Sequence, residues 1–360
     1  MPTQIRKAIK GLSAYSSGKP IDEVKRELGL TEVIKLASNE NPFGSSPKAL
    51  ESISSSLAEI NRYPEGSCFY LREALSKKLK IGPQSLIFGN GSDELIEIIA
   101  KTFLEQDDEA VISEMAFVRF EMAVKLMGAR AVVTKARNFA HDLSQMARSV
   151  TEKTKLIFVA NPNNPTGTMN TKDEVENFLR DVPEDVLVVF DEAYYEYVDR
   201  QDYPKTIDYL KEGRSLIILR TFSKIYGLAG LRIGYGLSQP EIIKDLNRVR
   251  PPFNVNSLAQ VAALAALGDE QWVNECRRKN EEGREFLYQE LDRLGLAYVQ
   301  SVTNFVLLDV KEDAQEAFKR LLTEGVIVRP ITKSYIRVTI GTQEENKKFI
   351  LALEKVLTTN

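Results

Sequence analysis

The chain has 360 residues, which is more than one typical domain holds and enough for two that share a core. Apolar residues make up 43% of it and charged residues 28%, and the net charge of −3 gives no basic field that would attract nucleic acid or an anionic membrane. Its apolar stretches are too short to span a bilayer and the N-terminus has no signal-peptide core, so we expect a cytoplasmic protein.

Histidine and cysteine are scarce, and this limits the chemistry that we expect. Two cysteines, Cys68 and Cys276, give neither a disulfide framework nor a zinc site, and we expect buried or half-buried thiols. The sole histidine, His141, lies in a segment that reads as a loop before a helix, and we expect a surface or capping residue. A His-based metal site and a Ser-His-Asp hydrolase are therefore disfavoured, and we expect no metal.

The middle of the chain alternates short apolar runs with amphipathic segments. Several of the runs are continuous and β-branched, which is typical of strands buried on both faces of a mainly parallel sheet. Between them, residues 95–104 carry one apolar stripe of a helix, and Thr171 with Glu174 predicts a capping box. This rhythm predicts a three-layer α/β domain. The expected strands are residues 85–88, 110–112, 131–134, 156–160, 186–190, 215–219 and 232–236.

After about residue 255 the pattern changes to long helices, expected at 257–267 and 271–294. Strands are expected at 297–309, 326–329 and 336–340, and a final helix begins near Thr342, which forms a second capping box with Glu345. We therefore predict a smaller α+β domain. The predicted division is an N-terminal arm or part of the small domain at 1–40, a large cofactor-binding domain at 41–255 and the small domain at 256–360.

A glycine-rich turn at residues 88–94 follows one expected strand and opens a helix. Free backbone N–H groups and the helix dipole make such a turn a natural anion site. The rival interpretation, a dinucleotide fingerprint, fails because Glu94 stands where the third glycine should be. A plain turn remains the alternative if this motif is taken alone.

Lys224 follows a buried strand and precedes a glycine-rich stretch. A desolvated lysine has a lowered pKa, and it can attack an aldehyde and shuttle a proton. Thr221, Ser223 and Arg232 lie near it in sequence, and two hydroxyls with a guanidinium suit a phosphate dianion. Asp191 ends another apolar strand, where it could hold a pyridinium nitrogen or cap a helix.

Three motifs occur in order: Asn-Pro-Thr-Gly at 164–167, Asp-x-x-Tyr at 191–194, and Ser-Lys with an arginine eight residues after the lysine at 223–232. Together they resemble fold-type I aminotransferases, and most closely the histidinol-phosphate aminotransferase family, over nearly the whole chain. The resemblance implies a large three-layer α/β domain with a mainly parallel sheet, a smaller α+β domain, and pyridoxal 5′-phosphate (PLP) as cofactor.

The same resemblance implies roles for individual residues. Lys224, Asp191 and Tyr194 match the catalytic residues, and Tyr63 matches a tyrosine that reaches the cofactor phosphate of the neighbouring subunit. An active homodimer with shared sites is therefore expected. The other cofactor-binding residues implied are Gly91, Ser92, Asp93, Phe117, Asn164, Thr221, Ser223 and Arg232.

For the substrate, Arg329 and Arg337 match arginines that bind the substrate phosphate, although an arginine like Arg337 binds the α-carboxylate in aminotransferases generally. Tyr15 and Asn41 match further substrate-binding positions. The implied reaction exchanges L-glutamate and imidazole-acetol phosphate for 2-oxoglutarate and L-histidinol phosphate, in histidine biosynthesis.

The chain departs from the family in one place, because many members have a longer loop of the Gly-Tyr-Gly-Leu-Pro kind between the two arginines. Here only residues 330–336 separate them. The alternatives left open are an aromatic or broad-specificity aminotransferase, a decarboxylase of threonine phosphate and a non-catalytic PLP-binding regulator.

Overall fold

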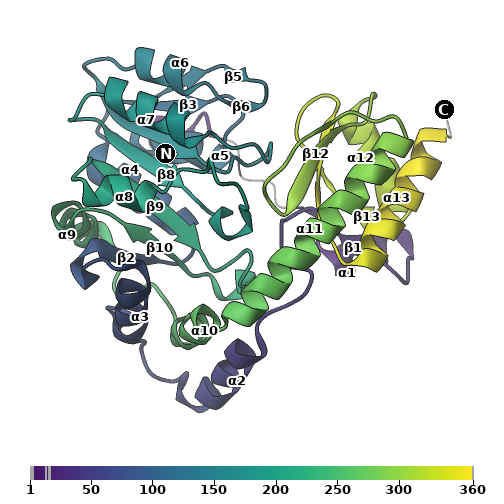
Figure 1. Ribbon diagram of the computed structural model, residues 1–360, viewed down its shortest axis with the longest axis horizontal. Helices are drawn as coiled ribbons and strands as arrows, with labels where there is room; N and C mark the ends of the chain where they lie inside the picture. The colour runs from purple at the N-terminus through teal and green to yellow at the C-terminus, as the bar shows by residue number, and fades with distance from the viewer. Residues whose placement is uncertain (1–3, 13, 15–17, 359–360) are drawn as a thin grey trace.

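The computed structural model describes residues 4–12, 14 and 18–358. Within them, seven strands form one sheet in the order β2-β10-β9-β8-β7-β3-β4, and only β10 runs antiparallel to its neighbours (Figure 1). All seven strands expected from the sequence are confirmed as members of this sheet. They are β2 (Leu86–Gly89), β3 (Glu109–Ser113), β4 (Arg130–Thr134), β7 (Thr154–Ala160), β8 (Leu187–Asp191), β9 (Leu216–Thr221) and β10 (Gly234–Leu237).

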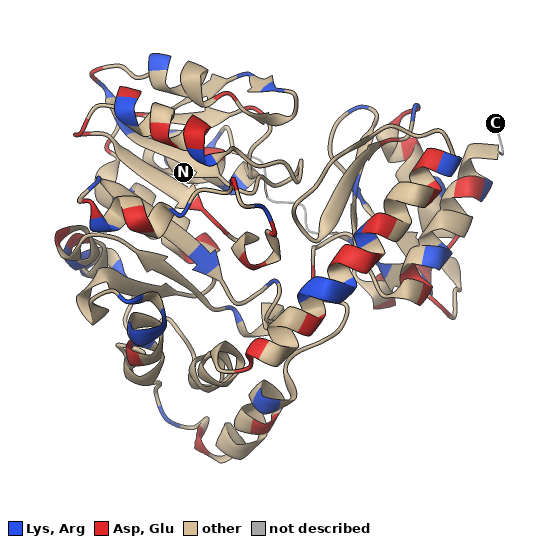
Figure 2. Cartoon of the chain, in the orientation of Figure 1, with Lys and Arg blue, Asp and Glu red and all other residues tan. Residues whose placement is uncertain are grey.

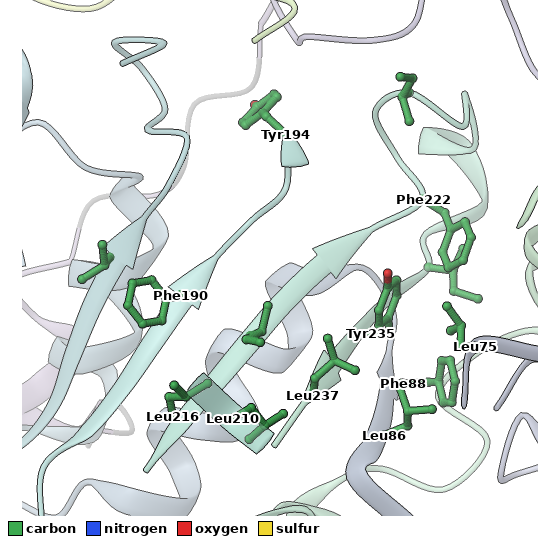
Figure 3. Packing of buried hydrophobic residues seen from close by; sticks show 14 of the residues in the cluster. Leu75, Leu86, Phe88, Phe190, Tyr194, Leu210, Leu216, Phe222, Tyr235 and Leu237 are labelled. Carbon is green, nitrogen blue, oxygen red and sulfur yellow. The ribbon is translucent and has the colours of Figure 1, made fainter. Parts of the chain in front are cut away.

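Helices cover both faces of this sheet, which confirms the three-layer α/β class. Successive side chains of a strand point to opposite faces. Accordingly, Leu86 and Phe88 belong to the core on one face, whereas Ile87 belongs to the core on the other. Figure 3 shows Phe88 of β2, Phe190 of β8 and Tyr235 of β10 in the first of these cores.

The helices divide between the two faces. One face packs against α4 (Ser92–Phe103), α5 (Val118–Met127) and α9 (Pro240–Val249). The other face packs against α2 (Pro47–Ser56), α3 (Phe69–Leu79), α6 (Leu143–Arg148), α7 (Lys172–Asp181), α8 (Thr206–Lys211) and α10 (Ser257–Leu267). Short 3-10 helices lie at η1 (Lys7–Ile9), η2 (Leu57–Glu59), η3 (Pro83–Ser85), η4 (Tyr195–Tyr197) and η5 (Ala229–Leu231).

A second sheet of four strands lies in the C-terminal part of the described chain, in the order β11 (Tyr298–Val299), β12 (Phe305–Asp309), β15 (Tyr335–Thr339) and β14 (Arg329–Pro330). Its helices are α11 (Glu270–Arg293), α12 (Ala314–Thr323) and α13 (Gln343–Thr358), which enclose a separate apolar core. Near it, β1 (Ile34–Lys35) pairs with β13 (Val326–Ile327), and α1 (Ile21–Leu28) packs beside them. The domain division at residues 40 and 255 stays a prediction.

Two strand predictions in this part were wrong. The single strand expected at 297–309 is two strands, β11 (Tyr298–Val299) and β12 (Phe305–Asp309), because Ser301 and Thr303 between them bond to each other and to nearby backbone groups. The strand expected at 326–329 is split between two sheets, because β13 pairs with β1 while β14 (Arg329–Pro330) pairs with β15 (Tyr335–Thr339).

Helix α11 runs from the large sheet to the small one, and acidic and basic residues alternate along it (Figure 2). Arg278, for example, pairs with both Glu275 and Glu282 at helical spacing. Both predicted capping boxes are confirmed, at Thr171 with Glu174 and at Thr342 with Glu345. No helix in the described ranges is long and apolar enough to cross a membrane.

The expectation for His141 was wrong. It lies in β6 (Ala140–His141), the second strand of a hairpin with β5 (Ala136–Arg137), and its side chain is 2% exposed. Burial lowers the pKa of the imidazole to about 4, so the ring is neutral at physiological pH. Both cysteines are buried, as expected.

Candidate active site

A cavity of about 660 Å³ lies beside the carboxyl ends of β7, β8 and β9, with β14 and β15 of the small sheet on its other side. Open α/β sheets place their ligands at this edge. The cavity brings together most of the residues that the sequence singled out. They are Ser92, Asp93, Phe117, Asn164, Asp191, Tyr194, Thr221, Ser223, Lys224, Arg232, Arg329 and Arg337.

Lys224 is the buried amine of this cavity. Its Nζ donates a hydrogen bond to the Ser38 carbonyl at 3.4 Å and lies 5.6 Å from the centre of the Tyr194 ring. Burial, and then the positive charge of Arg337, lowers the lysine pKa to about 8. A sizeable fraction of the side chain is therefore a neutral amine near pH 8, which is the form that attacks an aldehyde or accepts a proton.

Asp191 is the last residue of β8 and is 6% exposed. Burial raises the pKa of its carboxyl group to about 7, although Oδ1 accepts a hydrogen bond from the Ala193 backbone at 3.1 Å. A cationic partner stabilises a buried carboxylate more than it stabilises an exposed one, because the interior has a lower dielectric constant. The environment therefore favours a cationic group beside this side chain.

Tyr194 lies between the two sheets, and its contacts include a residue that the sequence did not reveal. Asn39 donates from Nδ2 to the Tyr194 hydroxyl at 2.8 Å, and Asn39 is 1% exposed. The Tyr194 ring also meets Phe305 of β12 edge to face, with centroids 5.2 Å apart. Asn39 lies in a loop near Asn41, and its role is visible only through this contact, which joins residues 155 positions apart.

Three segments bring hydrogen-bond donors to one end of the cavity. Ser92 opens α4, so the N-terminus of that helix faces the cavity. A Cβ atom on Gly91, where φ is +81°, would lie 2.5 Å from Nη2 of Arg232, so glycine is required for the guanidinium to approach. Arg232 also donates to Ser223 Oγ at 3.4 Å. Backbone amides, a hydroxyl and a guanidinium thus converge as a phosphate site needs.

Two arginines come from the small sheet. Arg329 of β14 pairs directly with Arg337 of β15 in the antiparallel register, so their side chains share a face. Arg337 is 9% exposed; it donates to the Ala37 carbonyl at 2.7 Å and to Oδ1 of Asn164 at 2.5 Å. The register gathers positive charge on one side of the cavity.

The remaining predicted residues lie elsewhere. Tyr63 is 83% exposed and stacks on Phe253, with centroids 4.9 Å apart. Asn41 is not among the described residues that line the cavity. Its side-chain amide donates to the Ile225 carbonyl at 2.7 Å and to Cys276 Sγ at 3.3 Å. Tyr15 falls outside the described residues.

A buried ion pair behind the cavity also went unpredicted. Glu192 and Arg220 are 0% and 4% exposed, and Oε2 of the glutamate accepts from both Nε and Nη2 of the arginine at 2.8 Å. Each is a chain neighbour of a cavity residue, Asp191 or Thr221 respectively. The signal that could have revealed them is a charged residue inside or at the end of an otherwise apolar strand.

Known proteins with similar sequences are aminotransferases. The family model for class I and II aminotransferases matches residues 31–353. A histidinol-phosphate aminotransferase of Moorella thermoacetica is 51% identical over 98% of this chain and 92% of its own length. One of Caldicellulosiruptor saccharolyticus is 48% identical, over 98% and 99% respectively.

Solved structures agree. The histidinol-phosphate aminotransferase of Sinorhizobium meliloti in complex with pyridoxal-5′-phosphate superposes with a TM-score of 0.92 at 29% identity, over 99% of this chain and 98% of that one. A Thermus thermophilus aspartate aminotransferase double mutant, at 24% identity and a TM-score of 0.86, has the same fold over 98% of this chain and 100% of its own. This chain therefore belongs to the class I and II aminotransferase family.

Proposed function

We propose that this aminotransferase uses PLP to move an amino group between L-glutamate and imidazole-acetol phosphate, giving 2-oxoglutarate and L-histidinol phosphate, in histidine biosynthesis. The near relatives named above support this reaction, because the chain matches them over almost its full length. The observation that carries the proposal is the cross-strand pair of Arg329 and Arg337 in the cavity that also holds Lys224.

Like charges directly opposite on neighbouring strands are destabilising. A phosphate dianion between the two guanidinium groups relieves that repulsion and gives charge-assisted, bidentate hydrogen bonds. An aromatic substrate carries an α-carboxylate for one arginine but no anion for a second. The two adjacent arginines therefore favour an aminotransferase for a phosphorylated substrate over an aromatic or broad-specificity aminotransferase.

The residues present suit PLP. Arg232, Ser223 and the N-terminus of α4 form an anion site, and the absence of a side chain at Gly91 leaves the space that the guanidinium occupies. Asp191 is a buried carboxylate that would face the ring nitrogen, and Phe117 lines the same cavity where it would stack on the ring. When bound, PLP supplies an electron sink for negative charge that develops on the substrate carbon.

The roles of the protein groups follow from their positions. As a neutral amine, Lys224 Nζ would accept the proton from the substrate carbon and hold it as an ammonium group until it is passed on to a carbon of the cofactor. Tyr194 and Asn164 would hold the phenolic oxygen, and their partners Asn39 and Arg337 keep them in place. Arg337 would also bind the α-carboxylate of L-glutamate. Arg329 would bind the phosphate group, which L-glutamate lacks.

The proposal is tested by single-turnover absorbance of the yellow holoenzyme, mixed separately with L-histidinol phosphate and L-phenylalanine. We expect rapid bleaching by L-histidinol phosphate at low concentration and much slower bleaching by L-phenylalanine. Equal or faster bleaching by L-phenylalanine would instead assign an aromatic or broad specificity. Release of carbon dioxide from threonine phosphate would assign the decarboxylase.

The proposed active unit is a cytoplasmic homodimer whose subunits share their sites. Supporting this, large apolar side chains are exposed along residues 57–70, from η2 to the start of α3. Their exposed fractions are 50% for Leu57, 62% for Ile60, 83% for Tyr63, 52% for Phe69 and 74% for Tyr70. A second copy of the chain would cover such a surface and bring Tyr63 to the neighbouring cofactor site.

A further inference from the structure

The turn of the β5–β6 hairpin has an unusual residue in it. Asn138 and Phe139 join the two strands, and both have positive φ, +51° and +65°. Two successive left-handed residues between paired strands are the pattern of a type I′ turn, which strongly prefers Asn-Gly. Asn138 suits the first position, but Phe139 occupies the position where glycine is favoured. A bulky residue in the left-handed region persists only where other contacts hold it.

The contact that holds Phe139 crosses to the small sheet. Its ring lies 5.3 Å from the ring of Tyr335, centroid to centroid, at an interplanar angle of 55°. Tyr335 is the first residue of β15, two positions before Arg337 and therefore on the same face of the strand. The hairpin lies at the side of the large sheet that faces the small one (Figure 1).

A second set of contacts joins the same hairpin to the cofactor side of the cavity. The Phe139 carbonyl accepts a hydrogen bond from Thr168 Oγ1 at 2.9 Å, and that hydroxyl lies 2.8 Å from Thr166 Oγ1. Thr166 also accepts from Asn163 Nδ2 at 2.8 Å. These residues flank Asn164, which accepts from Arg337 at 2.5 Å. Contacts therefore run from Phe139 to Arg337 by two routes, one through Tyr335 and one through this turn.

We propose that Phe139 is a positioning residue for the substrate phosphate, since it docks the β5–β6 hairpin against the β14–β15 hairpin that carries Arg329 and Arg337. The inference rests on the proposed function, because it assumes that these arginines receive the phosphate. The segment between the two arginines is short, and Tyr335 lies at its end. The ring of Phe139 packs where that segment enters β15, and so fixes the strand from outside the cavity.

The test is Phe139→Gly in the holoenzyme. Glycine is favoured at this turn position, so the melting temperature should stay the same or rise. If the ring positions the arginines, KM for L-histidinol phosphate should rise about fivefold or more while kcat changes less than about twofold. A residue that acts only in packing would show the reverse: a lower melting temperature and an unchanged KM. That result would overturn the proposal.

Two matched variants separate the ring from the turn. Phe139→Tyr keeps an aromatic ring and should keep the KM of the wild type, whereas Asn138→Gly changes the neighbouring left-handed residue and should leave KM unchanged. Tyr335→Ala should raise KM as Phe139→Gly does. The KM of the double variant should be no higher than that of the more impaired single variant. Additive effects of the two substitutions would contradict a shared contact.

Failure of this inference differs from failure of the proposed function. If wild-type enzyme does not react with L-histidinol phosphate, the proposed substrate is wrong. In that case inhibition by inorganic phosphate, compared between wild type and Phe139→Gly with whichever amine the enzyme accepts, still tests the contact. Equal inhibition of the two would overturn the role of Phe139.

Discussion

Arg337 donates a hydrogen bond from Nη1 to Oδ1 of Asn164 at 2.5 Å, across 173 positions of sequence. The arginine belongs to the small sheet, whereas the asparagine belongs to the turn after β7 of the large sheet. One is the proposed ligand of the substrate and the other the proposed ligand of the cofactor. This contact therefore ties the substrate side of the cavity to the cofactor side.

Lys224→Ala should fold and bind PLP but lose at least about 10⁴-fold in turnover, because it removes the proposed proton carrier. Its unfolding free energy should not fall, since the replaced amine is buried and its charged form is disfavoured there. Single-turnover absorbance with L-histidinol phosphate measures the first effect, and urea unfolding the second. Lys319→Ala on α12, where the side chain is 66% exposed, is the control. Turnover near that of wild type would remove Lys224 from the mechanism.

Asp191→Asn keeps the shape of the side chain but removes its charge. A protonated ring nitrogen of PLP would then lose its negatively charged partner. We expect kcat to fall at least about 10²-fold with little change in the melting temperature. Steady-state kinetics with L-glutamate and imidazole-acetol phosphate measure this. A loss below about tenfold would mean that Asp191 has a structural role alone.

The stability of the cofactor-free protein should depend on pH through Asp191. Burial raises the pKa of this carboxyl group to about 7, against an ordinary value of 3.8, so between these values the folded state holds a proton that the unfolded state has lost. Its contribution to stability is complete below about pH 4 and is lost as the pH rises through 7.

The unfolding free energy of wild type, measured relative to Asp191→Asn, should therefore fall between pH 5 and pH 8. Urea unfolding at the two pH values checks this. Taking the difference from the variant cancels other titrating groups, including Glu196, whose carboxyl pKa burial also raises to about 7. A difference that rises with pH would contradict the buried, protonated state of Asp191.

Arg329→Gln should act on phosphorylated substrates in particular. Loss of a charge-assisted contact should raise KM for L-histidinol phosphate about 10- to 100-fold. The reaction with L-histidinol, which has no phosphate, should change little. Arg293→Gln on α11, where the arginine pairs with Glu354 away from the cavity, is the matched control. An equal rise in KM for L-histidinol phosphate and for L-histidinol would show that Arg329 has no part in recognising phosphate.

Ile60→Glu should weaken the proposed dimer, because it places a charge among exposed apolar side chains that a second copy would bury. Sedimentation velocity should show a shift from dimer to monomer, with reduced activity in the monomer. Leu351→Glu on α13, at a leucine that is 67% exposed, should leave the assembly unchanged. A monomeric wild type would refute shared sites.

Local patterns in the chain predicted the large sheet well. Its strands are continuous apolar runs because both faces are covered by helices, and the bounds differ from expectation by one or two residues at most ends. The clustering of the proposed cofactor residues was also predictable, since Asp191 and Thr221 end strands and the carboxyl ends of β7, β8 and β9 meet beside one cavity. Positions at or after the ends of predicted strands, together with the family resemblance, predicted that Asp191, Thr221 and Lys224 lie there.

Long-range packing decided what the patterns could not. His141 lies in a short segment that reads as a loop, yet the β5–β6 hairpin buries its side chain. The split of residues 326–329 between two sheets depends on which partner strand each residue meets.

The sequence by itself determined the strands of the large sheet, the two capping boxes and the candidate reactive groups, because these depend on neighbours a few positions away. Only the tertiary structure decided that Arg329 lies opposite Arg337, that Asn39 supports Tyr194 and that Phe139 meets Tyr335. Such contacts depend on strand register and on how two sheets pack together, and no local pattern of residues fixes either.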